Sequence, residues 1–310
     1  MIINTGQRTD IPAFFSGWFA NRLKEGFVCV RNPFHPQQVS RYRLNPSVVD
    51  VIGFCTKNPA PMFPHMELLK EYGQYWFVTI TPYGRDIEPN VPDKHKILED
   101  FCRLSEIVGS DSMGWRYDPI FLNERYTAKY HLKAFRQMAA RLEGATETVV
   151  ISFIDLYSKV KRNFPEAREV SEEDKLMLGK EFIGIAGEHG MTVKPCGEGD
   201  FLAPYGADCA GCMTVKTYEQ AVHKKLVVPS FSPNRAECAC YIACDIGAYD
   251  TCGHLCRYCY ANNDVEQVKR NLKLYDPKSP FLIGGYREDD LIHDVPQKSW
   301  VDGQISLFDE

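Results

Sequence analysis

Short apolar runs alternate with helical stretches along the first two thirds of the chain, and the runs are rich in β-branched and aromatic residues. Between two of these runs, Tyr126–Leu142 places its apolar residues at helical spacing, so one face of that helix should pack on a sheet. Strands that alternate with helices form βαβ units and a parallel sheet. We therefore predict an α/β fold with strands at Ile2–Thr5, Val48–Thr56, Tyr75–Thr81, Met113–Tyr117, Thr148–Ile154 and Met191–Lys194.

Four consecutive runs end in a compact polar element. Proline and aspartate also end strands and start turns, which is the simpler explanation for any one of these elements. In parallel α/β folds, however, the C-terminal ends of the strands carry the active site. We therefore expect one shared, polar mouth built from Arg8–Pro12, Thr56–Pro59, Thr79–Pro82 and Arg116–Pro119.

Composition narrows the class of protein. With 310 residues, 44% of them hydrophobic and 25% charged, the chain is globular, which excludes disordered and collagen-like proteins. A formal net charge of −5 provides no overall basic field and so counts against binding nucleic acid through its phosphates. No apolar run is long enough to span a bilayer and the first residues do not resemble an export signal, so we expect a cytoplasmic protein without membrane contact.

Cysteine clustering indicates metal binding. Nine of the twelve cysteines follow residue 195, and cytosolic cysteines are kept as thiols. Cys252, Cys256 and Cys259 have C-x3-C-x2-C spacing. Structural zinc sites and ferredoxin clusters take four protein ligands, whereas three tightly spaced cysteines suit an iron–sulfur cluster with one open iron. The alternative is a zinc site that recruits Cys244 or His254 as its fourth ligand.

A second group of cysteines has C-x2-C and C-x-C-x3-C spacings. We interpret it as the ligand set of a second iron–sulfur cluster, with a zinc site and a plain cysteine-rich loop as alternatives. The remaining three cysteines, Cys29, Cys55 and Cys102, stand alone in apolar surroundings and are expected to be buried. The second group comprises Cys196, Cys209, Cys212, Cys238, Cys240 and Cys244.

The C-x3-C-x2-C motif, with Tyr258 just before its last cysteine, resembles the signature of the radical S-adenosylmethionine superfamily. The wider string Tyr249–Ala261 is similar to the cluster loop of the spore photoproduct lyase-like branch. This resemblance implies a [4Fe–4S] cluster whose open iron chelates S-adenosylmethionine. It also implies an electron donor, such as flavodoxin or ferredoxin, whose electron cleaves the cofactor to methionine and a 5′-deoxyadenosyl radical.

The motif lies near the C-terminus, whereas it is N-terminal in that superfamily, so the resemblance implies a circularly permuted radical SAM core. Asp245–Leu274 would then supply the first strand, cluster loop and helix of a partial or full TIM-like (β/α) barrel. Permutation is physically reasonable because chain termini tend to lie close together. Thr9-Asp10 and Thr56-Lys57 match the TD and TK strand ends that follow the cluster in the lyase-like branch.

The resemblance also implies roles for individual residues. Arg116 and Asp118 would face the substrate as catalytic residues. The chain further resembles an uncharacterised bacterial family, a domain of unknown function with a radical-SAM-like C-terminus, through Lys194–Cys196 and Arg235–Cys240. That likeness favours Cys196, Cys212, Cys238 and Cys240 as the auxiliary ligands, leaving Cys209 and Cys244 as spares. The residues expected to bind S-adenosylmethionine are Thr9, Asp10, Lys57, Thr81 and Tyr258.

We expect one domain over residues 1–285, with an auxiliary metal segment at 196–244 and the cluster loop and helix at 245–275. Residues 286–310 should form an extended tail. Its Gln304–Phe308 is similar to the peptide by which bacterial replication and repair proteins bind the sliding clamp, although a last turn packed on its own domain is the simpler alternative. Three hypotheses remain: a radical enzyme for a nucleic acid or nucleotide, one for a small metabolite or peptide, and a zinc-stabilised binding module.

Overall fold

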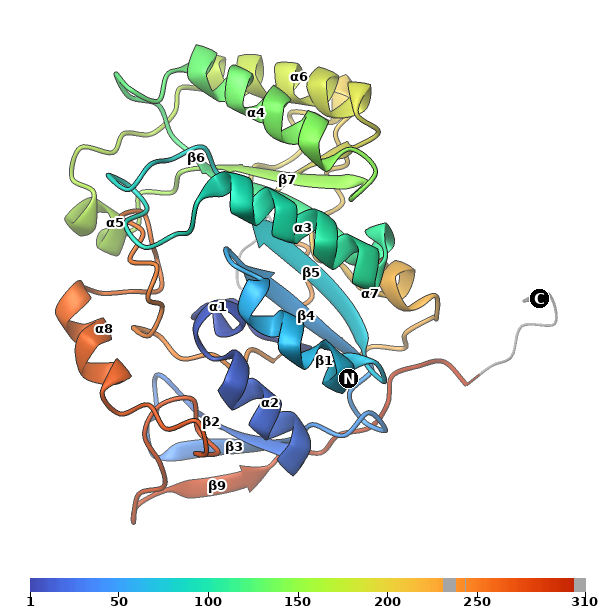
Figure 1. Cartoon of the computed structure of the whole chain (residues 1–310), viewed down its shortest axis with the longest axis vertical. Helices are drawn as coiled ribbons and strands as arrows, with labels where there is room; N and C mark the ends of the chain where they lie inside the picture. Colours follow the sequence, from blue (N-terminus) through green and yellow to red (C-terminus); the bar gives the residue numbers. More distant parts are fainter. Residues whose placement is uncertain (231–237, 243, 304–310) are drawn as a thin grey trace.

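A six-stranded parallel sheet forms the centre of the protein (Figure 1). The structure is a computed structural model, and it describes residues 1–230, 238–242 and 244–303. Each of the six predicted apolar runs contributes one strand, which confirms the α/β prediction. In spatial order the strands are β1 (Ile2–Asn4), β4 (Val51–Thr56), β5 (Gly73–Thr79), β6 (Met113–Ile120), β7 (Thr148–Phe153) and β8 (Thr192–Pro195).

The helices follow the strands along the chain, and most of them cover one face of the sheet (Figure 1). The predicted helical stripe is confirmed in α4, where Phe135, Met138, Ala139 and Leu142 are buried. The helices are α1 (Ile11–Phe14), α2 (Ser16–Glu25), η1 (Ala60–Leu69), α3 (Lys94–Val108), η2 (Ser110–Ser112), α4 (Ala128–Leu142), α5 (Ser158–Asn163), α6 (Glu172–Glu188), η3 (Ala203–Tyr205), α7 (Val215–Val222) and α8 (Val265–Leu272).

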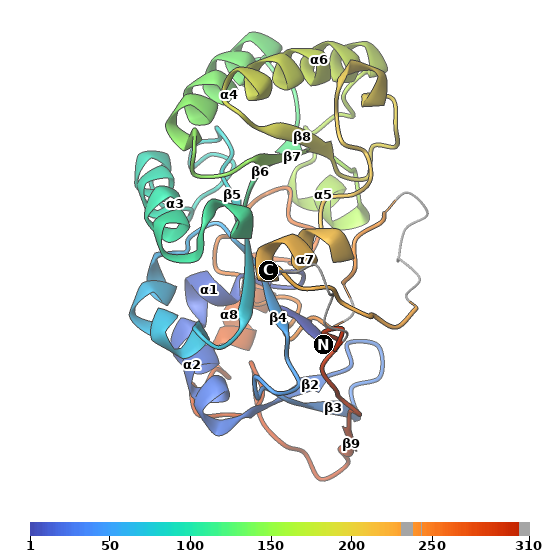
Figure 2. The same cartoon turned by 90° about the vertical axis from the view of Figure 1, so that its right-hand side faces the viewer.

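The two faces of the sheet pack against different partners, because successive side chains of a strand point to opposite faces. On β5, Trp76 and Val78 belong to the large core beneath the helices. Tyr75 and Phe77 point the other way, into a smaller core that includes Tyr218 of α7. Figure 2 places α3 and α7 on opposite sides of β5. The second face is thus covered by α7 and the cysteine-rich segment around it.

The predicted TIM-like barrel is not closed. Over the described residues β1 and β8 are the two edges of the sheet, and no pairing joins them. The segment after β8 forms α7 and cysteine-bearing loops instead of further strands, and these lie against the face that would have been the interior of a barrel. Tyr218 accepts a hydrogen bond from Asn4 Nδ2 there (2.9 Å). Full closure is therefore corrected to an open parallel sheet flanked by helices.

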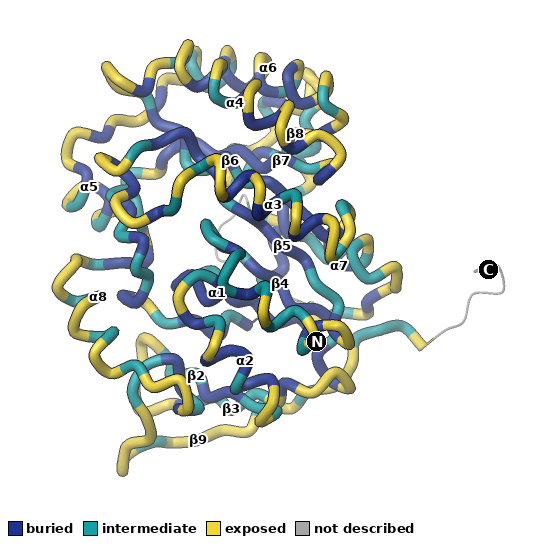
Figure 3. Tube along the Cα trace, viewed as in Figure 1, coloured by how far each residue is buried: buried dark blue, intermediate teal, exposed yellow. Residues whose placement is uncertain are grey.

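A second, three-stranded sheet lies at one end of the molecule, where β2 (Phe27–Arg31) pairs antiparallel with β3 (Gln38–Arg43), and β3 pairs parallel with β9 (Leu291–Asp294). Figure 3 shows β9 exposed along its length. β9 belongs to the stretch expected to be an extended tail. Beyond it, Trp300 donates from its backbone to Asp50 Oδ2 (2.7 Å), so this stretch also contacts the main sheet region.

The predicted clamp-binding peptide, Gln304–Phe308, lies outside the described residues. Among the residues that are described, no helix combines the length and the hydrophobicity needed to cross a bilayer.

Candidate functional site

A cleft of about 670 Å³ lies at the C-terminal ends of the parallel strands. Thr9, Lys57, Asp118 and Ile154, which end or follow β1, β4, β6 and β7, line it together with both groups of cysteines. The polar strand ends that the sequence singled out therefore do share one mouth.

The C-x3-C-x2-C loop reaches this cleft because the chain before it runs beside β1. Asp245 forms a parallel bridge with Asn4, whose backbone donates to Cys244 O (2.6 Å) and accepts from Ile246 N (3.0 Å). An ion pair between Arg8 Nε and Asp245 Oδ2 (2.6 Å) also holds residue 245 beside the segment that follows β1. Because residues 244–246 run parallel to β1, the chain leaves them at the cleft end of the sheet.

The cysteine loop is held by hydrogen bonds around an unusual backbone. Asp250 and Leu255 have φ values of 58° and 56°, a left-handed conformation that side chains other than glycine seldom adopt. Asp250 Oδ2 accepts from Asn263 Nδ2 (2.7 Å), and Cys252 O accepts from Asn262 Nδ2 (2.9 Å). These contacts pin the loop in a conformation that its own residues would not favour alone.

Within this loop Cys256 is buried, while Cys252 and Cys259 are half-buried, and all three line the cleft. Burial raises the pKa of the Cys256 thiol to about 12, and Lys57 opposes that shift. The Cys256 thiol is therefore protonated at neutral pH.

Glu88 is the residue that organises the cleft wall beside these cysteines, and nothing in the sequence pointed to it. Its carboxylate is fully buried and accepts from Lys57 Nζ (2.8 Å) and Thr81 Oγ1 (2.6 Å). Lys94 and the Tyr258 hydroxyl also donate to it. Burial alone would raise the pKa of Glu88, but Lys57 and Lys94 lower it to about 2. Three of the five residues assigned to cofactor binding thus meet on one carboxylate.

Asp10 links three separate segments of the chain through its carboxylate. One of its oxygens caps α1 by accepting from Ala13 N (3.0 Å), and the other accepts from Lys57 N (2.7 Å) and lies 2.9 Å from His254 Nε2. Its oxygens are therefore already used within the protein. Thr9 differs, because its hydroxyl is buried and has no hydrogen-bond partner among the described residues. A ligand in the cleft could supply that partner.

Arg116 and Asp118, predicted to face the substrate, both line the cleft but are paired with each other. The guanidinium of Arg116 also lies 3.9 Å from the sulfurs of Cys196 and Cys212. Asp118 therefore holds Arg116 against the second group of cysteines.

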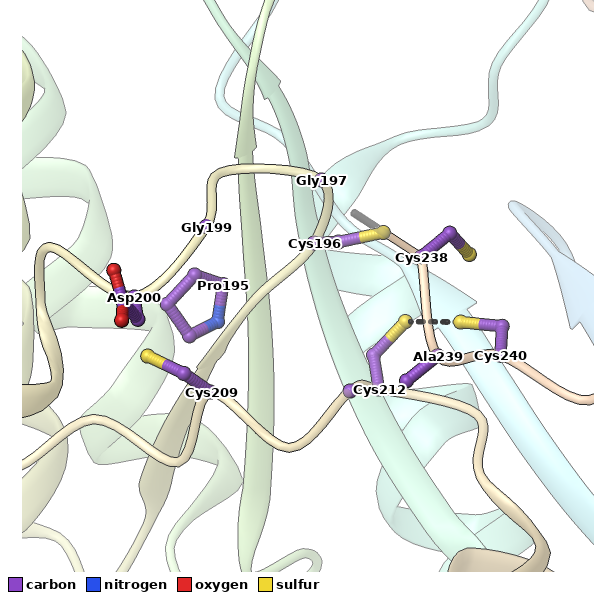
Figure 4. A pocket seen from close by; sticks show the side chains of 11 residues that line it. Pro195, Cys196, Gly197, Gly199, Asp200, Cys209, Cys212, Cys238, Ala239 and Cys240 are labelled. Atoms are coloured by element: carbon purple, nitrogen blue, oxygen red, sulfur yellow. Dashed lines mark hydrogen bonds between the residues drawn. The ribbon is translucent and has the colours of Figure 1, made fainter. Parts of the chain in front are cut away.

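That second group is drawn in Figure 4. Cys212 Sγ and Cys240 Sγ are 3.2 Å apart, and Cys196 and Cys238 line the same small cavity. Hydrogen bonds from Cys212 and Cys240, assisted by Arg116, hold the pKa of Cys196 well below its usual value even though burial opposes the shift. Cys209 points away, toward Pro195 and Asp200.

The three isolated cysteines differ in burial and in surroundings. Cys29 is buried in a small core of its own and Cys102 is half-buried on α3. Cys55, expected to be a buried hydrophobe, instead lines the cleft, where Gln7 Nε2 lies 3.7 Å from its sulfur. The backbone of Gly6 approaches so closely that an added Cβ would lie 2.4 Å from Cys55 Cβ.

The cysteines of the cleft do not form a ready-made site for a metal ion. Over residues 1–230, 238–242 and 244–303, no three Cys, His, Asp or Glu side chains already stand in the geometry of a single metal ion's ligands. The C-x3-C-x2-C loop nevertheless presents three thiols to one cleft, with the Lys57 ammonium and the unpartnered Thr9 hydroxyl beside them. Thiolates are the ligands that iron–sulfur clusters take.

Fold and site together define a parallel α/β protein with a cysteine-lined cleft at its strand ends. Residues 2–261 match the family described as a domain of unknown function, DUF1848, so the chain belongs to that family. The match runs from β1 to the end of the C-x3-C-x2-C motif and thus includes both groups of cysteines. It agrees with the uncharacterised family expected from the sequence. No curated protein matches the chain.

Proposed function

We propose that this protein is a radical S-adenosylmethionine enzyme with a [4Fe–4S] cluster on Cys252, Cys256 and Cys259. The observation that carries the proposal is that these three thiols stand on one loop at the C-terminal ends of a parallel sheet. The open sheet with residues 244–246 beside β1 is also the arrangement expected of a circularly permuted core. When bound, such a cluster passes one electron, received from a donor such as flavodoxin or ferredoxin, to S-adenosylmethionine and splits it into methionine and a 5′-deoxyadenosyl radical.

The residues around the loop supply counter-charge. Glu88 is paired with two lysines, so the buried group of Glu88, Lys57 and Lys94 keeps one positive charge. Lys57 lies on the cleft wall and lowers the pKa of the Cys256 thiol, which favours the thiolate form. Lys57 therefore stabilises negative charge at the loop, and Glu88 holds Lys57 in position.

Further polar groups are left to bind ligands. The Thr9 hydroxyl is available as donor or acceptor for a polar group of S-adenosylmethionine. Asp118 of β6 lines the same cleft, and we assign it, together with its partner Arg116, to the substrate side. The protein's task is to bring the two ligands into contact and to exclude water.

The test is anaerobic reconstitution with iron and sulfide, followed by dithionite reduction with S-adenosylmethionine. We expect 5′-deoxyadenosine to be released, and replacement of Cys252, Cys256 and Cys259 by alanine to remove about four irons and to abolish release. Cys102→Ala on α3 is the matched control and should change neither quantity. Stoichiometric zinc on the three cysteines, with no labile sulfide, would instead support the zinc-stabilised binding module.

A further inference from the structure

The second group of cysteines gathers four thiols from three separate segments. Cys196 directly follows β8, Cys212 precedes α7, and Cys238 and Cys240 belong to the loop that leads on to residue 244. All four line one small cavity of about 240 Å³ together with Cys209, and these four, without Cys209, also line the larger cleft. Three segments that are far apart in sequence therefore bring their thiols together at one side of the cleft.

A half-buried cation faces these thiols. Arg116 projects from β6 with its two terminal nitrogens 3.9 Å from the sulfurs of Cys212 and Cys196. Thiols that merely fill a hydrophobic core need no such partner, because neutral cysteine behaves as a small hydrophobe. A guanidinium held against sulfur by Asp118 is instead suited to thiolates, the form in which cysteine binds metal.

The spacing of the sulfurs distinguishes between kinds of metal centre. In a tetrahedral zinc site, with Zn–S bonds near 2.3 Å, two sulfurs are separated by roughly 3.8 Å. Cys212 and Cys240, at 3.2 Å, reach that separation by a small side-chain rotation. In a [4Fe–4S] cluster each thiolate binds a different iron, so the sulfurs must stand much farther apart. The close contact therefore favours one ion, around which the other thiols must close by side-chain rotation, because no three ligand side chains of the described residues already stand in that geometry.

We infer that Cys196, Cys212, Cys238 and Cys240 bind one thiophilic divalent ion of the zinc type, with Arg116 as its counter-charge. This differs from the second iron–sulfur cluster preferred on sequence grounds. Four thiolates close the coordination shell, so the ion ties β8, α7 and the following loop together as one wall of the cleft. The inference concerns different cysteines from the proposed cluster and stands independently of it.

Cys209 provides the sharpest control. Its C-x2-C spacing with Cys212 is the pairing typical of zinc sites, so spacing alone would make it a ligand. In the structure its side chain points toward Pro195 and Asp200, away from the other sulfurs (Figure 4). We expect Cys209→Ser to keep the metal, and Cys196→Ser and Cys240→Ser to lose it.

The experiment is titration of the chelator-treated, reduced full-length protein with Co²⁺ and then Zn²⁺ under anaerobic conditions. We expect intense thiolate-to-cobalt absorption that saturates at one equivalent, persists when Cys252, Cys256 and Cys259 are alanine, and disappears as zinc displaces cobalt. Arg116→Met should weaken metal binding roughly 10- to 100-fold, as expected for a partner of the ligands, and Arg116→Lys should restore part of the loss. Both Arg116 variants keep all four thiols, so they report on binding even if a cysteine variant fails to fold.

Three outcomes would overturn the inference. One is the absence of stoichiometric binding in the reduced protein. Another is loss of the metal in Cys209→Ser. The third is labile sulfide that disappears with Cys196 or Cys240, which would make the centre a cluster.

Discussion

His254 Nε2 lies 2.9 Å from Asp10 Oδ2, so a side chain of the C-x3-C-x2-C loop is joined to the residue at the start of α1. The same carboxylate caps α1 and accepts from the backbone of Lys57. One buried side chain therefore connects the start of α1 and the residue after β4 with the cysteine loop.

Asp10→Ala should for this reason cost more than the loss of a helix cap. We expect the free energy of unfolding to fall by about 2 to 4 kcal/mol, because the Lys57 N–H and His254 lose a buried acceptor in addition to the cap. Asp93→Ala removes the exposed cap of α3 and should cost only about 1 kcal/mol. Urea denaturation measures the free energy of unfolding of both variants. Equal losses in Asp10→Ala and Asp93→Ala would contradict the linking role of Asp10.

Glu88→Gln should destabilise the protein in a pH-dependent way. The carboxylate has a pKa of about 2 in the folded protein against an ordinary value of 4.5. A depressed pKa stabilises the fold fully above the ordinary value, and this contribution is lost as pH falls from about 4.5 toward 2. We expect a loss of about 3 kcal/mol at neutral pH that shrinks as the pH drops through this window. Denaturation of wild type and variant at each pH tests this, and a difference that does not change with pH would disprove it.

Lys57 and Lys94 allow a matched comparison of binding, because both pair with Glu88 but only Lys57 lines the cleft. Lys57→Met in the reconstituted protein should weaken binding of S-adenosylmethionine roughly 10- to 100-fold, the range for losing a hydrogen bond to a charged group. Lys94→Met should lower stability without a comparable change in affinity. Isothermal titration separates the two effects, while iron content checks that the cluster is retained. Equal effects on affinity would make Lys57 a folding residue.

Gly6 should tolerate no side chain. Its Cβ would lie 2.4 Å from both Cys55 Cβ and Cys55 O, and the backbone cannot easily move away. Gly6→Ala should therefore cost at least 1 to 3 kcal/mol, the usual range for overpacking. Gly17 on α2 meets nothing within 4 Å, so Gly17→Ala should instead stabilise the helix by about 0.5 to 1 kcal/mol. Thermal denaturation gives the sign of each change.

The sheet could be predicted because its strands leave a local signal. Each apolar run is continuous in sequence, and the polar residues at its end must lie at the same edge once the strands are parallel. Barrel closure could not be predicted in the same way. It depended on the segment that contains α7, where Tyr218 packs on the sheet face through contacts that no periodicity reveals.

The residues of the site likewise fall into those with a local sequence signal and those that depend on contacts between distant segments. Cysteine spacing identified the C-x3-C-x2-C loop, which is local. Glu88 lies in an irregular loop, and its role depends on lysines and a tyrosine brought from other segments, so the sequence alone carried no sign of it. The direction of Cys209 is likewise a property of the folded loop and not of C-x2-C spacing.

The pairing of β1 with residues 244–246 also determines when the outer edge of β1 is covered during synthesis. β1 is synthesised long before residues 244–246, so its outer edge stays uncovered until that segment has been made. An uncovered strand edge invites pairing with other chains. Nascent or truncated chains that end before residue 244 should therefore be prone to aggregation.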